Sequence, residues 1–235
     1  MPDNLSNRRV GAADGVEVPW VGRQLTNAAL GIGTDVLCRR DPDLAAIVRR
    51  FGAPPLWGRR PGFQTLVRII LEQQVSLAAA RTMYLRLMRR VGQISPASIE
   101  QLGISGLRGL GLTGQKAGYC HELAARLGAG ELDLPSITRA PDHVGRQILL
   151  GIRGIGPWTA DIYYLMALRR PDVWPHGDLA LASVVASIKG MRSRPDAARL
   201  TRLAEQWSPW RSVAARILWH HYLSSRTANA AVAPF

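Results

Sequence analysis

Three glycines lie close together in the stretch GIRGIGPWTAD, residues 151–161, and an apolar, helix-compatible stretch follows them directly. Gly151, Gly154 and Gly156 give this segment unusual backbone freedom, because glycine adopts positive φ and permits close approach. The free amides of such a turn, together with those of the next helix's first turn, can point at an anion such as a phosphate. A contact made only by backbone groups would not depend on nucleic acid sequence. The alternative is that the glycines merely permit a tight turn between two helices.

A single carboxylate occupies the centre of the loop that follows this helix. Asp178 comes 20 residues after Trp158, in the stretch VWPHGDLAL, and another apolar helix is expected directly after it. An aspartate before a helix most often caps it, since its side chain accepts hydrogen bonds from free amides. The same carboxylate could instead stabilise a positive charge that develops in a reaction. The spacing alone leaves both roles open.

The composition favours a polyanionic partner. The 235 residues carry a formal net charge of +13, with a sequence pI of about 11.2, which is typical of proteins that bind nucleic acid or an acidic membrane surface. The alternative is compositional, because nearly all of the basic residues are arginines and such richness can reflect genome base composition. With 47% apolar residues, the chain can bury a sizeable core, as one domain or two small ones.

Cysteine content and hydropathy narrow the function classes. Cys38 and Cys120 are too few for a four-thiolate zinc site or an iron-sulfur cluster, so we expect neither. We find no apolar core of signal-peptide length near the N-terminus and no run of eighteen apolar residues. The sequence therefore predicts a cytoplasmic protein with no membrane association.

The elements that must position these residues are predicted to be helices throughout. A polar or glycine cap followed by proline recurs at Asp41/Pro42, Ser95/Pro96, Gly156/Pro157 and Ser208/Pro209. Apolar residues repeat at helical spacing between these starts, and strand alternation is nearly absent. We expect an all-α fold, with later helices over roughly 114–127, 142–150, 157–168, 179–188, 196–206 and 209–223.

Five stretches together carry a resemblance to a known family. They are ILEQQVSLAAA, LRGLGLTGQKA, LLGIRGIGPWTADIYYLMAL, VWPHGDLAL and WSPWRSVAARILWHHY, in that order, between about Asp41 and Tyr222. They resemble the helix-hairpin-helix (HhH-GPD) DNA glycosylase superfamily, in its alkylated-base branch, 3-methyladenine DNA glycosylase II. The resemblance implies two helical subdomains flanking a cleft, without the N-terminal β domain of larger relatives.

Composition and the resemblance together predict a division of the chain. Residues 1–38 are rich in Gly, Asn and Asp and have weak periodicity, so we expect an N-terminal extension there, and 225–235 would be a C-terminal tail. The glycosylase domain would cover 39–224, with one subdomain at about 60–175 that contains the hairpin 150–157. The second subdomain would combine 39–59 with 176–224.

The same resemblance assigns roles around the cleft. Asp178 matches the family's catalytic aspartate, which would stabilise an oxocarbenium-like sugar and orient a water molecule. Trp158 and Trp219 match pocket tryptophans, whose indole faces favour a cationic methylated base. Ile162 stands where relatives carry another pocket aromatic, which leaves the base preference open. The alternative for Trp219, on an amphipathic helix, is an ordinary core residue.

The reaction type follows from a missing lysine. Bifunctional relatives carry a lysine in the helix after the hairpin, whereas this chain has no lysine between Lys116 and Lys189. We therefore expect a monofunctional enzyme that hydrolyses the N-glycosidic bond of alkylated purines and leaves the strand intact.

Double-stranded DNA with damaged bases is the implied partner, bound by a monomer. The expected contacts lie at the hairpin, at LGLTGQKA and at EQQVS, where the family inserts a wedge into the gap left by a flipped base. They are Ile152, Gly154, Ile155, Gly156, Thr159, Gly111, Gly114, Lys116, Gln73 and Gln74. Solvent-facing glutamines and a solvated lysine are the alternatives for the last three. No cofactor is expected, although the carbonyls of Leu150, Ile152 and Ile155 could hold a Na⁺ or K⁺ ion.

Two other readings compete with this one. A helix-hairpin-helix module without catalytic activity would bind DNA but need neither Asp178 nor an aromatic pocket. A glycosylase for deaminated or oxidised bases would share the fold and differ in its lesions.

Overall fold

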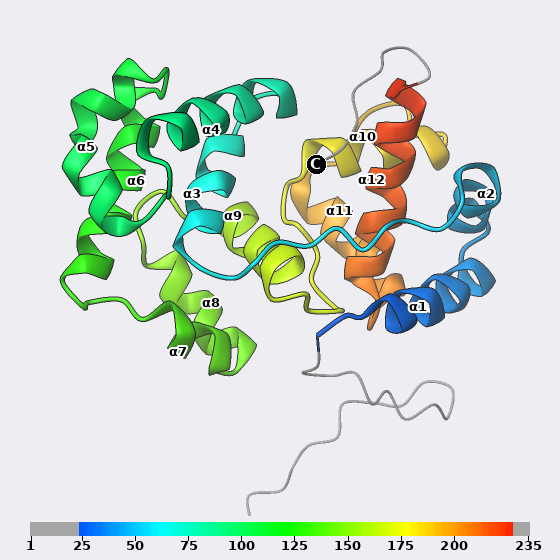
Figure 1. Ribbon diagram of the computed structural model, residues 1–235. Coiled ribbons are helices and arrows are strands. Elements are labelled where there is room, and N and C mark those ends of the chain that lie inside the picture. The colour runs from blue at the N-terminus through cyan, green and yellow to red at the C-terminus, as the bar shows by residue number, and fades with distance from the viewer. Residues whose placement is uncertain (1–23, 228–235) are drawn as a thin grey trace, which may run out of the picture.

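The computed structural model describes residues 24–227, and every regular element in that range is helical (Figure 1). The prediction of an all-α fold is therefore confirmed. The helices form two groups, which appear on the left and right of Figure 1, and the linker 52–62 runs between them.

The first subdomain is continuous in sequence. It contains α3 (Phe63–Glu72), α4 (Leu77–Val91), α5 (Pro96–Gly109), α6 (Gly114–Gly128), α7 (Leu134–Arg139), α8 (Asp142–Leu150) and α9 (Pro157–Ile162). The last of these continues as a π-helix, η1 (Tyr163–Ala167). Helices α8 and α9 with the turn between them form the hairpin that the glycine pattern predicts.

The second subdomain joins the two ends of the described chain. It contains α1 (Asn27–Arg40), α2 (Pro42–Phe51), α10 (Leu179–Ile188), α11 (Ala197–Ala204), the 3-10 helix η2 (Glu205–Trp207) and α12 (Arg211–Thr227). Helix α12 packs on α1, α2 and α10 and is the centre of this group.

Helix α1 corrects the predicted N-terminal extension. Residues 27–38 belong to this helix, whose Ala29, Leu30 and Leu37 are buried in the core with α2 and α12. Gly33 lies so close to Trp210 that an added Cβ would stand 2.7 Å from the indole. Small residues allow this close packing, and they also give the segment the weak periodicity that hid the helix. Ahead of this helix, the Leu25 N–H donates to the Arg169 carbonyl at 2.7 Å, and residues 1–23 of the predicted extension lie outside the described residues. The predicted start of the C-terminal tail at residue 225 is wrong, because α12 continues to Thr227; residues 228–235 lie outside the described residues.

Most proline-marked starts are confirmed, because α2, α5 and α9 begin at Pro42, Pro96 and Pro157. The start predicted at Pro209 is wrong by two residues, since α12 begins at Arg211. The N–H of Trp210 instead donates to the carbonyl of Trp207 at 2.7 Å, which extends the preceding 3-10 turn.

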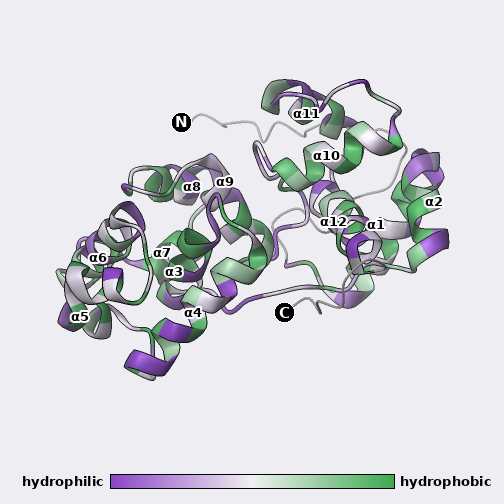
Figure 2. Ribbon diagram, turned by 90° about the horizontal axis from the view of Figure 1, so that it is seen from above, coloured by the Kyte–Doolittle hydropathy of each residue, from purple (hydrophilic) through white to green (hydrophobic). Residues whose placement is uncertain are grey.

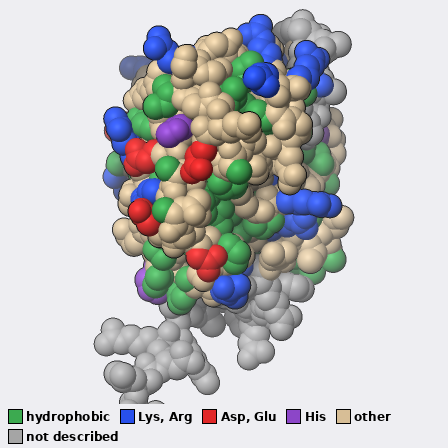
Figure 3. All heavy atoms as spheres, turned by 60° about the vertical axis from the view of Figure 1, so that its left-hand side comes forward, with side chains coloured by type: hydrophobic (Ala, Val, Ile, Leu, Met, Phe, Trp, Pro, Cys, Tyr) green, Lys and Arg blue, Asp and Glu red, His purple; other side chains and the backbone are tan. Residues whose placement is uncertain are grey.

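The helices differ in hydropathy along their length, and the charged side chains are spread unevenly over the surface. Helix α10 is apolar over most of its length in Figure 2, whereas α2 and α4 carry hydrophilic segments. The face in Figure 3 has most of its Lys and Arg side chains near the rim and acidic side chains nearer the middle. The net positive charge is therefore not concentrated at the centre of that face.

Candidate active site and DNA interface

A cleft of about 2080 Å³ lies between the two subdomains. The first subdomain supplies the end of α3, the start of α4, the hairpin and α9. The second supplies the 176–180 segment and one face of α12, and the linker contributes residues 57–59. The predicted arrangement of two helical subdomains flanking a cleft is thus confirmed.

Asp178 lies in this cleft and caps α10. Its Oδ1 accepts a hydrogen bond from the Leu181 N–H at 2.9 Å. Its Oδ2 accepts one from the indole Nε1–H of Trp158 at 2.9 Å, and Oδ1 accepts a longer one from Trp219 at 3.4 Å. The carboxylate is 8% exposed. The capping role expected of an aspartate before a helix is therefore present, and the carboxylate also lines the cleft between two indoles.

No lysine or arginine in residues 24–227 forms an ion pair with Asp178. Its hydrogen-bond donors are a backbone amide and two neutral indoles. The negative charge is consequently oriented without being neutralised, and it remains available to a cation that enters the cleft.

The loop that carries Asp178 is fixed at several points that the sequence did not reveal. Arg211 donates to both carboxylate oxygens of Asp172 at 2.8 Å. Nearer the site, Asp161 accepts from the backbone N–H of His176 at 3.0 Å and from the Nε of Arg146 at 2.8 Å. Asp161 is 4% exposed on α9. A charged residue within the apolar stretch of this helix was the only signal that could have drawn attention to it.

The predicted pocket residues come together around Asp178. Trp158, Trp219 and Ile162 all line the cleft, and Met166 extends the surface one turn beyond Ile162. Trp219 is 9% exposed and also belongs to the core cluster, so the two readings of this residue are compatible. Because both indoles donate to the same carboxylate, Asp178 also orients the two rings.

The hairpin has the backbone geometry expected for an anion site. Gly154 has φ of +88°, a conformation that favours glycine. An added Cβ would also stand 2.2 Å from the Tyr119 ring, so the space around this position requires glycine as well. Ile152 and Ile155 are buried and anchor the turn. Gly156 is the N-cap of α9 and provides no side-chain cap, which leaves the first amides of the helix free.

Two of the predicted DNA contacts, Gln73 before α4 and Thr159 on α9, have side chains that bond to each other inside the protein. The side chain of Gln73 donates through Nε2 to the Gly154 carbonyl at 2.8 Å and to the Thr159 hydroxyl at 2.9 Å. Thr159 is only 2% exposed. We predicted a phosphate contact from this hydroxyl, but it faces Gln73 instead, because that glutamine closes the space between α3 and the hairpin.

The side chain of Gln74, unlike that of Gln73, is exposed to solvent. This residue lies at the edge of the cleft with φ of +53°, a left-handed conformation uncommon for a residue other than glycine. The exposed Val75 and Leu77 follow it. Backbone strain of this kind is typical of functional loops.

The turn between α5 and α6 contains the second group of predicted contacts. Gly111 has φ of +98°, and the Thr113 hydroxyl caps α6 by accepting from the Lys116 N–H at 3.2 Å. The Lys116 side chain corrects our prediction that its charge contacts DNA, and it does not fit the alternative of a solvated lysine either. It is 7% exposed, its Nζ donates to the Leu71 carbonyl at 2.7 Å, and burial lowers its pKa.

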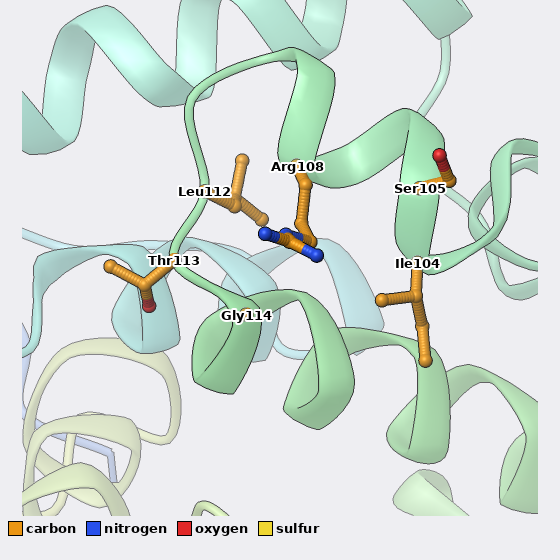
Figure 4. A pocket seen from close by; sticks show the side chains of 6 residues that line it. All are labelled: Ile104, Ser105, Arg108, Leu112, Thr113 and Gly114. Carbon is orange, nitrogen blue, oxygen red and sulfur yellow. The ribbon is translucent and has the colours of Figure 1, made fainter.

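Arg108 supplies an exposed cation at this turn that the sequence analysis missed. Its side chain reaches from α5 into a hollow of about 610 Å³ beside Thr113 and Gly114, as Figure 4 shows. The sequence LRGLGLTG could have indicated this cation, because an arginine directly precedes the glycines of the turn.

The monovalent-cation site stays a prediction. The Ile152 carbonyl already accepts the Ile155 N–H at 3.0 Å, which leaves it one further lone pair. Side-chain ligands offer no alternative in residues 24–227, where no group of three or more His, Cys, Asp or Glu is arranged to hold a metal. None of the described helices is both long enough and apolar enough to cross a membrane.

Comparisons with known proteins agree with this architecture. The DNA-3-methyladenine glycosylase of Bacillus subtilis is 26% identical over 78% of this chain, which spans 64% of that protein's length. The structure of the DNA-3-methyladenine glycosidase from Bacillus halodurans matches with a TM-score of 0.66 and 26% identity, over 84% of this chain and 91% of the other. The Schizosaccharomyces pombe 3-methyladenine DNA glycosylase in complex with abasic DNA has the same fold, with a TM-score of 0.73, 21% identity and coverage of 86% and 99%. The model of the HhH-GPD superfamily of base excision DNA repair proteins matches residues 67–209, and the chain therefore belongs to that superfamily.

Proposed function

We propose that this protein is a monofunctional DNA glycosylase that flips alkylated purines, of the 3-methyladenine and 7-methylguanine type, out of duplex DNA and hydrolyses the N-glycosidic bond. One observation carries the proposal: Asp178 presents an un-neutralised carboxylate to the cleft between the indoles of Trp158 and Trp219. The names of the relatives point to the same class of substrate.

The chemistry requires little from the protein beyond charge and orientation. When the bond between C1′ and the base nitrogen breaks, its electron pair leaves with the base, and positive charge develops on the sugar. Asp178 stabilises that charge, and a water molecule oriented by the carboxylate adds to C1′ and releases a proton to solvent. An alkylated purine that is already cationic departs as a neutral base, so no general acid is needed.

The indoles favour the same substrates. Flipping a base costs a few kcal/mol, and an aromatic pocket recovers part of that cost. A cationic base over an indole face gains roughly 0.5–2 kcal/mol, which a neutral purine does not. Ile162 and Met166 complete the wall with apolar surface.

Duplex DNA is the proposed partner of a monomeric, cytoplasmic enzyme. The amides around Gly156 hold one phosphate, with Ile152 and Ile155 as buried supports for that turn. Arg108 and the start of α6 at Gly114 hold a second phosphate. Gln74 enters the gap left by the flipped base.

The direct test is base release from duplexes that carry a single 7-methylguanine, 3-methyladenine, hypoxanthine or 8-oxoguanine. We expect release of the methylated purines, with strand breaks only after alkali treatment. Release of hypoxanthine or 8-oxoguanine alone would support the deaminated-base or oxidised-base alternative. Binding without release of any base would support a non-catalytic module.

Borohydride trapping tests the absence of lyase chemistry. No lysine lies between Lys116 and Lys189, so α9 offers no amine to form a Schiff base with C1′. We expect no covalent adduct between enzyme and DNA in the presence of borohydride. A trapped adduct would contradict the monofunctional mechanism.

The phosphate anchor is best tested at Gly156. Its φ of −86° suits any residue and an added Cβ meets nothing within 4 Å, whereas a side chain at Gly154 would collide with Tyr119. Gly156→Asp would cap α9 with its own carboxylate and exclude the phosphate. We expect roughly 10-fold weaker binding of damaged and undamaged duplex alike, with stability unchanged within about 0.5 kcal/mol.

Gly156→Ser is the matched control, because it caps the helix without adding charge. It should weaken binding less than Gly156→Asp, and the difference should shrink as salt is raised. Normal affinity of Gly156→Asp for every duplex would rule out the hairpin as the anchor.

A further inference from the structure

The linker between the subdomains, residues 52–62, forms part of the active-site cleft. It passes from α2 to α3 across the molecule (Figure 1), and its residues Trp57, Gly58 and Arg59 line the cleft. Trp57 is half-buried, so part of its surface is open. This third tryptophan in the cleft was not among the residues that the sequence pointed to.

Backbone contacts hold Trp57 beside the helix that carries the pocket wall. The Arg59 N–H donates to the Met166 carbonyl at 2.9 Å. Met166 lies one turn after Ile162 and lines the same cleft. The linker therefore runs alongside η1, at the level where the wall formed by Trp158, Ile162 and Met166 ends.

Arg216 ties this arrangement to α12. Its Nη2 donates to the Trp57 carbonyl at 2.9 Å and to the Leu165 carbonyl at 3.1 Å. Arg216 lies three residues before Trp219, so a single side chain joins the linker, η1 and the helix of the second pocket tryptophan. The indole of Trp57 also lies beside the ring of His220 on α12, with centroids 6.2 Å apart and the ring planes tilted by 58°.

This connection requires the burial of the Arg216 guanidinium, which lowers the stability of the fold. The residue is 0% exposed, and its Nε and Nη1 have no hydrogen-bond partner among the described residues. Burial, with a smaller contribution from Arg169, lowers the pKa of its guanidinium to about 10. A buried cation without a carboxylate destabilises a fold. Its two carbonyl contacts indicate that it positions the linker.

We propose that Trp57 forms the third aromatic wall of the base pocket and determines which bases fit, and that Arg216 is the residue that positions it. The inference rests on the proposed glycosylase function. An aromatic ring at the end of the wall supplies the stacking surface that Ile162 does not provide. A purine that enters between Trp158 and Trp219 then meets an indole, and a methylated cationic purine gains most from it.

The test compares Trp57→Ala and Trp57→Phe with the wild-type protein on duplexes that carry 7-methylguanine or hypoxanthine and on undamaged duplex. Loss of a stacking ring should lower kcat/KM for 7-methylguanine about 10-fold or more, and for hypoxanthine by less. Affinity for undamaged duplex should not change, because no phosphate contact is touched. Trp57→Phe should recover most of the lost rate.

Trp210→Phe provides a control for the loss of indole packing, since Trp210 is buried against Gly33 and does not line the cleft. It should leave the ratio of the two lesions at its wild-type value. An unchanged lesion ratio in Trp57→Ala would overturn the inference. A wild-type protein that releases no base would instead overturn the proposed function.

The positioning role of Arg216 is tested by a double-mutant cycle. Arg216→Met should change the lesion ratio in the same direction as Trp57→Ala, and the double variant should be no worse than Trp57→Ala alone. If Arg216→Met does not fold, Arg216→Lys, which keeps the positive charge, replaces it in the cycle. Independent, multiplying effects of the two substitutions would show that Arg216 does not act through Trp57.

Discussion

Two buried aspartates in this protein begin helices in nearly the same way. Asp41 caps α2 and is 3% exposed, while Asp178 caps α10 and is 8% exposed. Each accepts an indole hydrogen bond, from Trp207 at 3.0 Å and from Trp158 at 2.9 Å. Capping and the indole bond are therefore features of the fold and do not by themselves distinguish a catalytic residue.

The two sites differ in charge and in access. Lys189 donates to both oxygens of Asp41, at 3.2 and 3.1 Å, and this pair lies away from the cleft. Asp178 lies in the cleft and has no such cation among the described residues. A neutralised carboxylate contributes stability, whereas an oriented and un-neutralised one can stabilise a developing positive charge.

The comparison predicts the largest effect at Asp178. Asp178→Asn keeps a good N-cap but removes the charge, so base excision should fall at least about 100-fold. One oxygen acceptor is lost, which costs about 1 kcal/mol of stability. Single-turnover base release, DNA affinity and denaturant unfolding should be measured on the same preparation. Near-native excision would remove Asp178 from the mechanism.

The matching substitution at Asp41 should have the opposite result. Asp41→Ala removes the cap of α2, leaves the buried indole N–H of Trp207 without its acceptor and leaves Lys189 with Asp43 as its remaining partner. We expect a loss of about 2–4 kcal/mol in the free energy of unfolding. Excision per folded molecule should stay within about twofold of wild type, as measured at a temperature where the variant remains folded. A large fall in excision would mean that the two aspartates are not functionally distinct.

Features encoded by neighbouring residues were predictable from the sequence. Proline after a cap marked α2, α5 and α9, and glycines marked the hairpin, because capping and positive φ depend on a few adjacent residues. The cleft residues Asp178, Trp158 and Trp219 came from the order of motifs and from family resemblance. Helix α1 was missed because tertiary packing stabilises it, while its own periodicity is weak.

Side-chain directions were not predictable in the same way. Lys116 and Thr159 turn inward because partners far away in sequence, the Leu71 carbonyl and Gln73, accept or donate a hydrogen bond. The roles of Trp57 and Arg216 depend on contacts across more than 100 residues. Such contacts leave no local pattern, so only the folded structure reveals them.

A cation introduced beside Asp178 should make it resemble Asp41. Leu179 follows Asp178 directly and is 72% exposed, so a longer side chain has room there. In Leu179→Arg, a unit charge roughly 10 Å away is worth about 1–2 kcal/mol, which corresponds to roughly 10-fold slower excision. The effect should weaken as salt is raised, because an exposed charge is screened. Leu179→Gln controls for the lost leucine; an equal fall in both variants would implicate the apolar surface rather than the charge.

The smallest expected effect concerns the cation of the structural pair. Lys189→Met leaves Asp41 ionised without its partner and should cost about 1 kcal/mol of stability. Burial alone would raise the pKa of Asp41 above its ordinary value of 3.8, but hydrogen bonds from Trp207 and Lys189 outweigh burial and lower the pKa. Burial would likewise lower the pKa of Lys189, yet its bonds to Asp43 and Asp41 raise it above 10.5.

These directions define the pH range in which the pair stabilises the fold. The depressed pKa of Asp41 means that its contribution is present above about pH 4 and is lost as the pH falls through the folded pKa. The raised pKa of Lys189 means that its contribution is present below about pH 10.5 and is lost as the pH rises further. The difference in unfolding free energy between wild type and Lys189→Met should therefore be constant from about pH 5 to 10 and shrink outside that range. A difference that did not shrink as the pH fell below about 4 would show that Lys189 stabilises the protein through packing of its methylene groups and not through the charge of Asp41.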